Sequence, residues 1–175
     1  LVNTANHDRE WAEWHEALGT LHHVIPALPV PGNHDYVNLT RLTNGQEDDK
    51  LFVARRMVTP FWRAQFALPT EEALPADLLE TVYDVRYSAD LHVFALDSSG
   101  IAWLDQLDWL ERALERSDAR WRVLVMHHPI FSHVGGREHP AHAERRRALV
   151  DLLRAQDVDL VLAGHRHTYQ RAEMG

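Results

Sequence analysis

The stretch "VDLVLAGHRH", residues 158–167, joins a short apolar run to two closely spaced histidines. The run from 158 to 163 is typical of a buried β-strand. Gly164 then lets the backbone turn sharply and approach a ligand. Residues two apart in an extended segment point to the same side, so His165 and His167 are predicted to reach one site. Two interpretations follow: a polar loop that is rich in histidine, or a metal site.

Two other extended runs end in the same way. Residues 24–30 lead to "PGNHD" at 31–35, and the strand-like run 121–126 leads to "HHP" at 127–129. Loops at the carboxyl ends of parallel strands gather at one edge of an α/β sheet, where ligands bind. The three histidine loops are therefore expected to meet. Imidazole nitrogens with the carboxamide oxygen of Asn33 suit zinc, manganese, iron or nickel better than calcium, which favours the metal site.

Periodicity predicts the elements around these loops. Helices are expected over 7–18, with Gly19 as the stop, over two short pieces between 60 and 80, and over 103–117 and 141–156. Residues 81–87 and 91–96 are predicted to form a hairpin, and residues 37–50 a polar surface loop. The predicted buried positions of the two long helices are Leu104, Leu107, Leu110, Leu114, Ala148, Leu149, Leu152 and Leu153. Alternating helices and strands predict parallel pairing, and the hairpin makes the sheet mixed.

Composition narrows the class of protein. The 175 residues are 45% apolar, which predicts a single domain over 1–175. The net charge of −8 argues against an extended nucleic-acid partner. No apolar stretch approaches the roughly 20 residues that a membrane helix needs. Because there is no cysteine, disulfides and thiolate ligands are excluded. The compartment and the oligomeric state are left open.

The motifs "GNHD", "MHHP" and "GHRH", in this order, resemble those of the calcineurin-like metallophosphoesterases. The ending "GHRHTYQR" is similar to the purple acid phosphatase branch of that family. The resemblance implies a four-layer α/β/β/α sandwich with mixed sheets. It also implies hydrolysis of small phosphate esters, with monoesters as the first choice and diesters as the second. Two divalent or first-row transition metal ions (Mn, Fe, Zn or Ni) would serve as cofactors.

The same resemblance implies roles for individual residues. Its metal ligands are Asn33, His127 and His165 on one ion and His167 on the other. His34 would stand near the leaving group of the substrate, and Asp35 would orient His34. His128 directly follows a ligand, and we expect it to face the substrate, with inward packing as the alternative.

The sequence also departs from the family pattern. The two metal-binding motifs that contain the family's first aspartates, including the bridging one, are absent. We expect Leu1 to follow that bridging aspartate directly, which puts Asn3 where the purple branch has a tyrosine ligand. A pair of divalent ions is then expected instead of an iron–tyrosinate centre. The chain is also expected to lack the first βαβ unit and C-terminal strands, and to be inactive as the fragment given.

Two other functions stay open at this stage. A non-catalytic interaction domain would use the same scaffold without turnover. A nuclease is a weaker alternative, because the acidic net charge disfavours a long nucleic-acid track.

Overall fold

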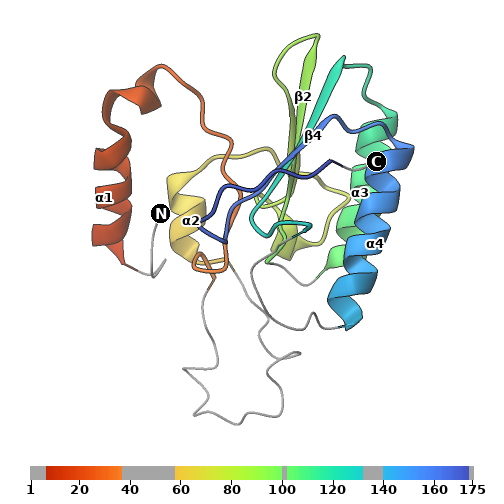
Figure 1. Cartoon of the computed structure of the whole chain (residues 1–175). Coiled ribbons are helices and arrows are strands. Elements are labelled where there is room, and N and C mark those ends of the chain that lie inside the picture. The colour runs from red at the N-terminus through yellow and green to blue at the C-terminus, as the bar shows by residue number, and fades with distance from the viewer. Residues whose placement is uncertain (1–6, 37–57, 100–101, 132–139, 174–175) are drawn as a thin grey trace.

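A computed structural model of the chain describes residues 7–36, 58–99, 102–131 and 140–173. Its centre is a four-stranded sheet in the order β1 (Tyr83–Arg86), β2 (Leu91–Leu96), β3 (Trp121–Met126) and β4 (Leu160–Leu162). The hairpin β1–β2 is antiparallel, whereas β2–β3 and β3–β4 are parallel (Figure 1). The mixed α/β architecture predicted from the sequence is confirmed.

Two long helices cover one face of this sheet. Helix α3 (Trp103–Glu115) connects β2 to β3, and α4 (Pro140–Ala155) connects β3 to β4; the two helices lie side by side (Figure 1). Their apolar faces pack on alternate strand residues, which point to the same side of a sheet. The core includes Phe94, Leu96, Trp109, Leu110, Leu114, Leu124, Met126, Leu149 and Leu153. Burial of these side chains fixes the sheet against the helices.

Three predictions of burial are wrong. Leu104 is 73% exposed, because it lies on the same side of α3 as the exposed Asp108 and Glu111. Ala148 is also exposed, beside the apolar face of α4. The run at 160–162 was predicted to be a buried strand, yet Leu160 and Leu162 are about half exposed. They belong to β4, the last strand of the described sheet, and point away from the helices.

A second, aromatic core lies beside α1 (Asp8–Leu18), which is followed by the 3₁₀-helix η1 (Gly19–His23). Trp11 of α1 packs edge to face on Phe66, just after α2 (Pro60–Gln65), and Phe66 contacts Trp62 in the same manner. The predicted helix stop is confirmed, because Gly19 adopts a φ of 49° that suits glycine. The second predicted piece between 60 and 80 is the 3₁₀-helix η4 (Ala76–Leu78).

The segment before the "PGNHD" turn is not a strand. Residues 26–32 pair with no strand of the described sheet, so the prediction of three sheet strands leading to three histidine loops is wrong for this one. Pro26 and Pro29 lack the N–H groups that a sheet ladder needs. A hydrogen bond of 2.6 Å from the Tyr83 hydroxyl to the Pro29 carbonyl holds the segment against β1 instead. The polar loop predicted at 37–50 lies outside the described residues.

A buried polar network joins the hairpin to the end of α3. His92 on β2 contacts the Asp84 carboxylate at 2.5 Å through Nε2 and the Ser117 hydroxyl at 2.8 Å through Nδ1. Both ring nitrogens of His92 therefore have a hydrogen-bond partner. His92 therefore stabilises the scaffold that carries the ends of the strands.

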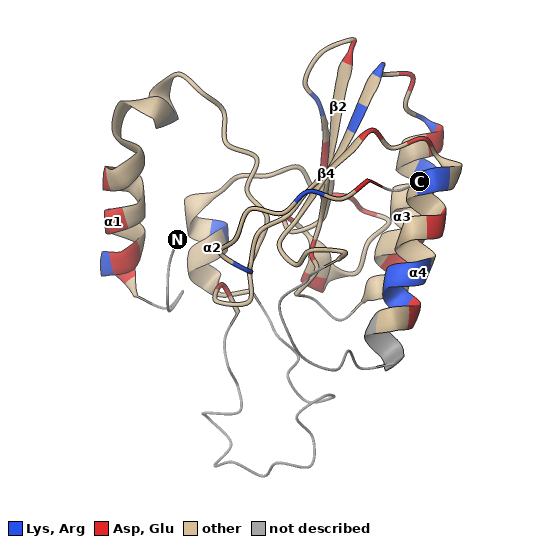
Figure 2. Ribbon diagram, viewed as in Figure 1, with Lys and Arg blue, Asp and Glu red and all other residues tan. Residues whose placement is uncertain are grey.

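Charged residues of both signs occur along the helices. Basic and acidic segments alternate along α4, and acidic residues mark α1 and α3 (Figure 2). Within the described residues, no helix has both the length and the apolar character that a membrane crossing requires.

Candidate metal centre

The parallel strand pairs bring two of the histidine loops together. Val125 of β3 is opposite Leu162 of β4, and continuing this register places His127 opposite Gly164. The Gly164 N–H indeed donates to the His127 carbonyl at 2.9 Å. The hydrogen-bond ladder thus extends beyond the two strands and fixes the position of the backbone just before His165.

Three side-chain atoms converge at this edge of the sheet. His127 Nε2 lies 2.9 Å from Asn33 Oδ1 and 3.0 Å from His165 Nδ1, and His165 Nδ1 lies 3.2 Å from Asn33 Oδ1. These residues form the Asn33–His127–His165 group. All three are half-buried. Each contributes an atom that can carry a lone pair, so the triangle has the donor character of a cation site.

At position 32 the site has no room for a side chain, whereas at position 164 it has. A Cβ on Gly32 would lie only 2.8 Å from Cε1 of the His127 ring, whereas a Cβ on Gly164 would make ordinary contacts near 3.8 Å. The sharp turn after β4 comes instead from His165 and His167, whose φ angles are 69° and 52°. Such left-handed conformations are uncommon outside glycine and cluster at functional sites. The prediction that 165–167 is an extended segment is therefore wrong.

The electrostatics of the group keep its imidazoles neutral. Burial, followed by the charges of neighbouring histidines, lowers the pKa of His127 from 6.5 to about 4. Burial also lowers the pKa of His165, with a further effect of the Arg166 charge. Neutral imidazole is the form that binds metals, so both rings have a lone pair available near neutral pH.

We expect the metal-free protein to lose stability as the pH falls from about 6.5 to about 4. Above this range His127 is neutral in both the folded and the unfolded chain. Within it, the unfolded chain binds a proton that the folded chain does not, so the free energy of unfolding decreases. Urea unfolding across this range measures the effect, and His127→Gln removes its contribution. An identical pH dependence in that variant would contradict the prediction.

The turn at 31–35 places the two predicted catalytic residues. His34 is exposed beside the group, and its positive charge lowers the pKa of His127. One oxygen of Asp35 accepts a 2.8 Å hydrogen bond from the Gly32 N–H and so closes the turn. Burial raises the pKa of Asp35, and this hydrogen bond opposes the rise. Tyr36 then donates to the buried carboxylate of Asp97, which anchors the turn to the end of β2.

His128 lies against the group, and Ser98 holds it there. The His128 ring stacks at a tilt on His165, with ring centres 4.3 Å apart. Nitrogen atoms of His127, His128 and His165 lie within 4.8 Å of one another. Ser98 contacts both the backbone and the ring of His128. Ser98 is not among the residues predicted from the sequence; the signal for it was the polar run "DSS" directly after the second strand of the hairpin.

His167 is not part of the convergent group. Its side chain is exposed, although its charge lowers the pKa values of His127 and His165 and so places it nearby. The structure thus brings together three of the four predicted ligands. The role of His167 on a second ion stays a prediction, as does the role of Asp35 in orienting His34. Asn3, whose register bears on the iron–tyrosinate prediction, lies outside the described residues.

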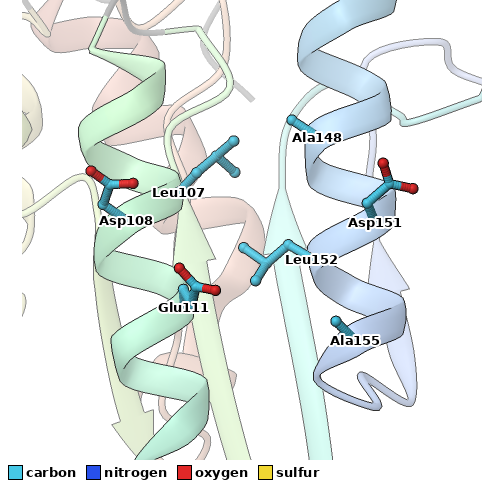
Figure 3. Close-up of a pocket in the computed structure, with 7 residues that line it drawn as sticks. All are labelled: Leu107, Asp108, Glu111, Ala148, Asp151, Leu152 and Ala155. Atoms are coloured by element: carbon cyan, nitrogen blue, oxygen red, sulfur yellow. The ribbon is translucent and has the colours of Figure 1, made fainter.

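A shallow cavity of about 360 Å³ lies elsewhere, between α3 and α4. Figure 3 shows Leu107 of α3 and Leu152 of α4 pointing toward each other between the two helices, which also carry the lining residues Asp108, Glu111 and Asp151. It contains no histidine. The convergent donor atoms of the Asn33–His127–His165 group lie at the sheet edge and not in this cavity.

Comparison with known proteins agrees with the geometry. The sequence signature described as Calcineurin-like phosphoesterase matches residues 1–169. The chain belongs to the calcineurin-like phosphoesterase family. The family resemblance inferred from the three motifs is thus confirmed.

Curated relatives of this calcineurin-like phosphoesterase are named as purple acid phosphatases. Purple acid phosphatase 21 of Arabidopsis thaliana is 32% identical over 94% of this chain and 35% of its own length. Purple acid phosphatase 15 of the same plant is 26% identical over 93% of this chain and 28% of its own length. Fe(3+)-Zn(2+) purple acid phosphatase 12 is 32% identical over 50% of the chain and 19% of its own length. The chain spans about a third or less of these relatives, and no solved structure gives a significant match.

Proposed function

We propose that this domain binds a first-row transition metal ion at the Asn33–His127–His165 group and hydrolyses small phosphate monoesters as part of a binuclear centre. The observation that carries the proposal is the convergence of Asn33 Oδ1, His127 Nε2 and His165 Nδ1 within 2.9–3.2 Å of one another. Membership of a phosphoesterase family and relatives that are named phosphatases support the reaction class.

The donor set fits a metal ion. Two ligands that bind one ion at about 2.1 Å lie about 3.0 Å apart at a right angle and about 3.4 Å apart in a tetrahedron. The three separations in the group fall near the first value. Two imidazoles and one carboxamide oxygen therefore have the spacing of neighbouring ligands around one ion. Such a mixed nitrogen and oxygen set suits manganese, iron, nickel or zinc.

A bound pair of ions would neutralise the charge of a phosphate group and make hydroxide available near neutral pH. The residues of the chain supply the rest of the chemistry. His34 is exposed, and in this proposal it delivers a proton to the departing alkoxide. His128 stacks on His165, and in this proposal it binds a phosphate oxygen.

The second ion is the less defined half of the proposal. His167 is its ligand in this chain, and further ligands belong to the family motifs that the sequence does not contain. One relative is named for iron and zinc, and both metals are within the set that this donor chemistry accepts. Phosphate diesters are the second substrate class.

The test is hydrolysis of a chromogenic phosphate monoester by the full-length protein. We expect turnover with added manganese or zinc, loss of turnover on chelation, and recovery when the metal is restored. His23→Ala is the matched control, because His23 is exposed on η1, outside the group, and should leave turnover unchanged. Absence of turnover with manganese, iron, zinc and nickel alike would reject the proposal.

The same experiment separates the alternative of a non-catalytic interaction domain. Such a domain would show no hydrolysis of monoesters or diesters, whether or not its histidines bind metal. Elemental analysis of the purified protein therefore accompanies the assay, since stoichiometric metal without turnover is the outcome that favours the interaction domain.

A further inference from the structure

The ends of three neighbouring strands form a row of polar side chains. Leu96 of β2 is opposite Met126 of β3, so continuing this parallel register places Ser98 opposite His128. On the other side of His128, its ring stacks on His165, with ring centres 4.3 Å apart. His128 thus lies between a serine hydroxyl and an imidazole of the Asn33–His127–His165 group.

Ser98 holds both the backbone and the side chain of His128. The backbone N–H of His128 donates to Ser98 Oγ at 2.8 Å, and the ring atom Nδ1 of His128 lies 3.0 Å from the same oxygen. A hydroxyl has one proton to donate. Among the described residues, Nδ1 of His128 is the acceptor that this hydroxyl contacts, so the Ser98 O–H donates to Nδ1. A neutral imidazole with Nδ1 as acceptor has its proton on Nε2.

We propose that Ser98 is a positioning residue that fixes the His128 ring beside the Asn33–His127–His165 group with its proton on Nε2, so that His128 donates a hydrogen bond to an oxygen of the bound phosphate group. This inference rests on the proposed function and adds a specific phosphate contact to it. Hydrogen bonds to charged oxygens are stronger than neutral ones, and a donor with a fixed orientation loses less entropy on binding. Ser98 does not touch the substrate and acts through His128.

The sequence offers a matched control in the next residue. Ser99 is also a serine after β2, but its buried hydroxyl has no hydrogen-bond partner among the described residues. Its backbone N–H instead donates to Asp97 Oδ1. Ser99→Ala removes the same atom from the same loop without touching His128, and Ser98→Thr keeps the hydroxyl that the proposal requires.

The first measurement reads the tautomer directly. Long-range ¹H–¹⁵N correlation spectra of ¹⁵N-histidine-labelled, zinc-loaded protein are recorded at about pH 8, well above the ordinary histidine pKa. The His128 signals are assigned by their absence in His128→Gln. We expect the proton on Nε2 in the parent and in Ser99→Ala, and a mixture of tautomers in Ser98→Ala. A proton on Nδ1 in the parent overturns the proposal even if Ser98→Ala fails to fold.

The second measurement is the affinity of the zinc-loaded protein for inorganic phosphate. Loss of an oriented, charge-assisted hydrogen bond should weaken phosphate binding about tenfold in Ser98→Ala. KM should rise by a similar factor with kcat nearly unchanged, whereas Ser98→Thr and Ser99→Ala should stay within about twofold of the parent. In a His128→Gln background, Ser98→Ala should have no further effect, because Ser98 acts through that ring. Equal effects of the two alanine variants, or an additive effect in that background, would overturn the proposal.

The two proposals fail in different ways. If the parent hydrolyses no phosphate ester, the proposed function is rejected, while the tautomer of His128 and its effect on phosphate binding still decide the role of Ser98. If the parent is an active phosphatase with His128 protonated on Nδ1, only the role of Ser98 is rejected.

Discussion

Replacing His165 with alanine is expected to reduce phosphate-ester turnover by more than about 100-fold and to weaken metal binding to a similar degree. His165 Nδ1 lies 3.0 Å from His127 Nε2 and 3.2 Å from Asn33 Oδ1, so its loss leaves two donors where an ion needs at least three from the protein. His165 does not belong to the apolar core that packs the sheet against the helices, so the alanine variant should leave core packing intact. Metal content by elemental analysis and turnover of a chromogenic phosphate measure the effect together.

A comparison with His34→Ala makes this prediction specific. His34 is exposed at the rim and is not one of the convergent donors, so its removal should lower turnover while metal content is retained. His23→Ala should change neither quantity. Full turnover in His165→Ala, or equal loss of metal in His34→Ala and His165→Ala, would contradict the assignment of ligand and proton donor.

Replacing Gly32 with alanine is expected to destroy the metal site through sterics alone. The added Cβ would lie 2.8 Å from Cε1, 2.9 Å from Nδ1 and 3.2 Å from Cγ of the His127 ring. These are atoms of a half-buried ring and not the end of a flexible chain, so either the ring or the turn at 31–35 must move. Forcing such overpacking costs about 1–3 kcal/mol. A shift of the ring also breaks the 2.9 Å contact with Asn33 Oδ1.

Gly164→Ala is the matched control for this change. Its Cβ would meet only the His127 carbonyl oxygen at 3.8 Å and Nδ1 at 4.0 Å, both ordinary contacts. We expect Gly32→Ala to lower the free energy of unfolding and to lose stoichiometric zinc, with Gly164→Ala close to the parent in both. Calorimetric zinc titration and urea unfolding test the pair. Tight zinc binding in Gly32→Ala would show that the ring adapts and would contradict the prediction.

The sequence predicted that the three histidine loops would meet, because each loop follows an apolar run that can be recognised locally. The runs before His127 and His165 do form the parallel strands β3 and β4, and the turn at 31–35 does present Asn33. The remaining run, residues 24–30, is not a strand, although the turn that follows it does bring Asn33 to His127 and His165. The Tyr83 hydroxyl and the Tyr36–Asp97 pair hold it there, and both are contacts between distant parts of the chain.

Other features depend on relations that no local pattern contains. Periodicity placed Leu104 in the buried stripe of α3, yet the direction in which the helix faces the sheet leaves it 73% exposed. A close approach of the backbone to the site was predicted at Gly164, from the turn that follows it. The close approach occurs instead at Gly32, where the backbone lies against the His127 ring. Ser98 was overlooked because a serine after a strand is common, and only the register of β2 against β3 puts it beside His128.

By itself, the sequence determined the chemistry: which side chains are available as ligands, their order after apolar strands, and the family to which the chain belongs. The tertiary structure decided which of those side chains meet. It brought Asn33, His127 and His165 into one triangle, left His167 at the exposed margin, and set Ser98 against His128. The physical reason is that the residue pattern along a chain fixes the face on which a side chain lies. The spacing of atoms across a sheet depends on strand register and on steric contacts between segments far apart in sequence.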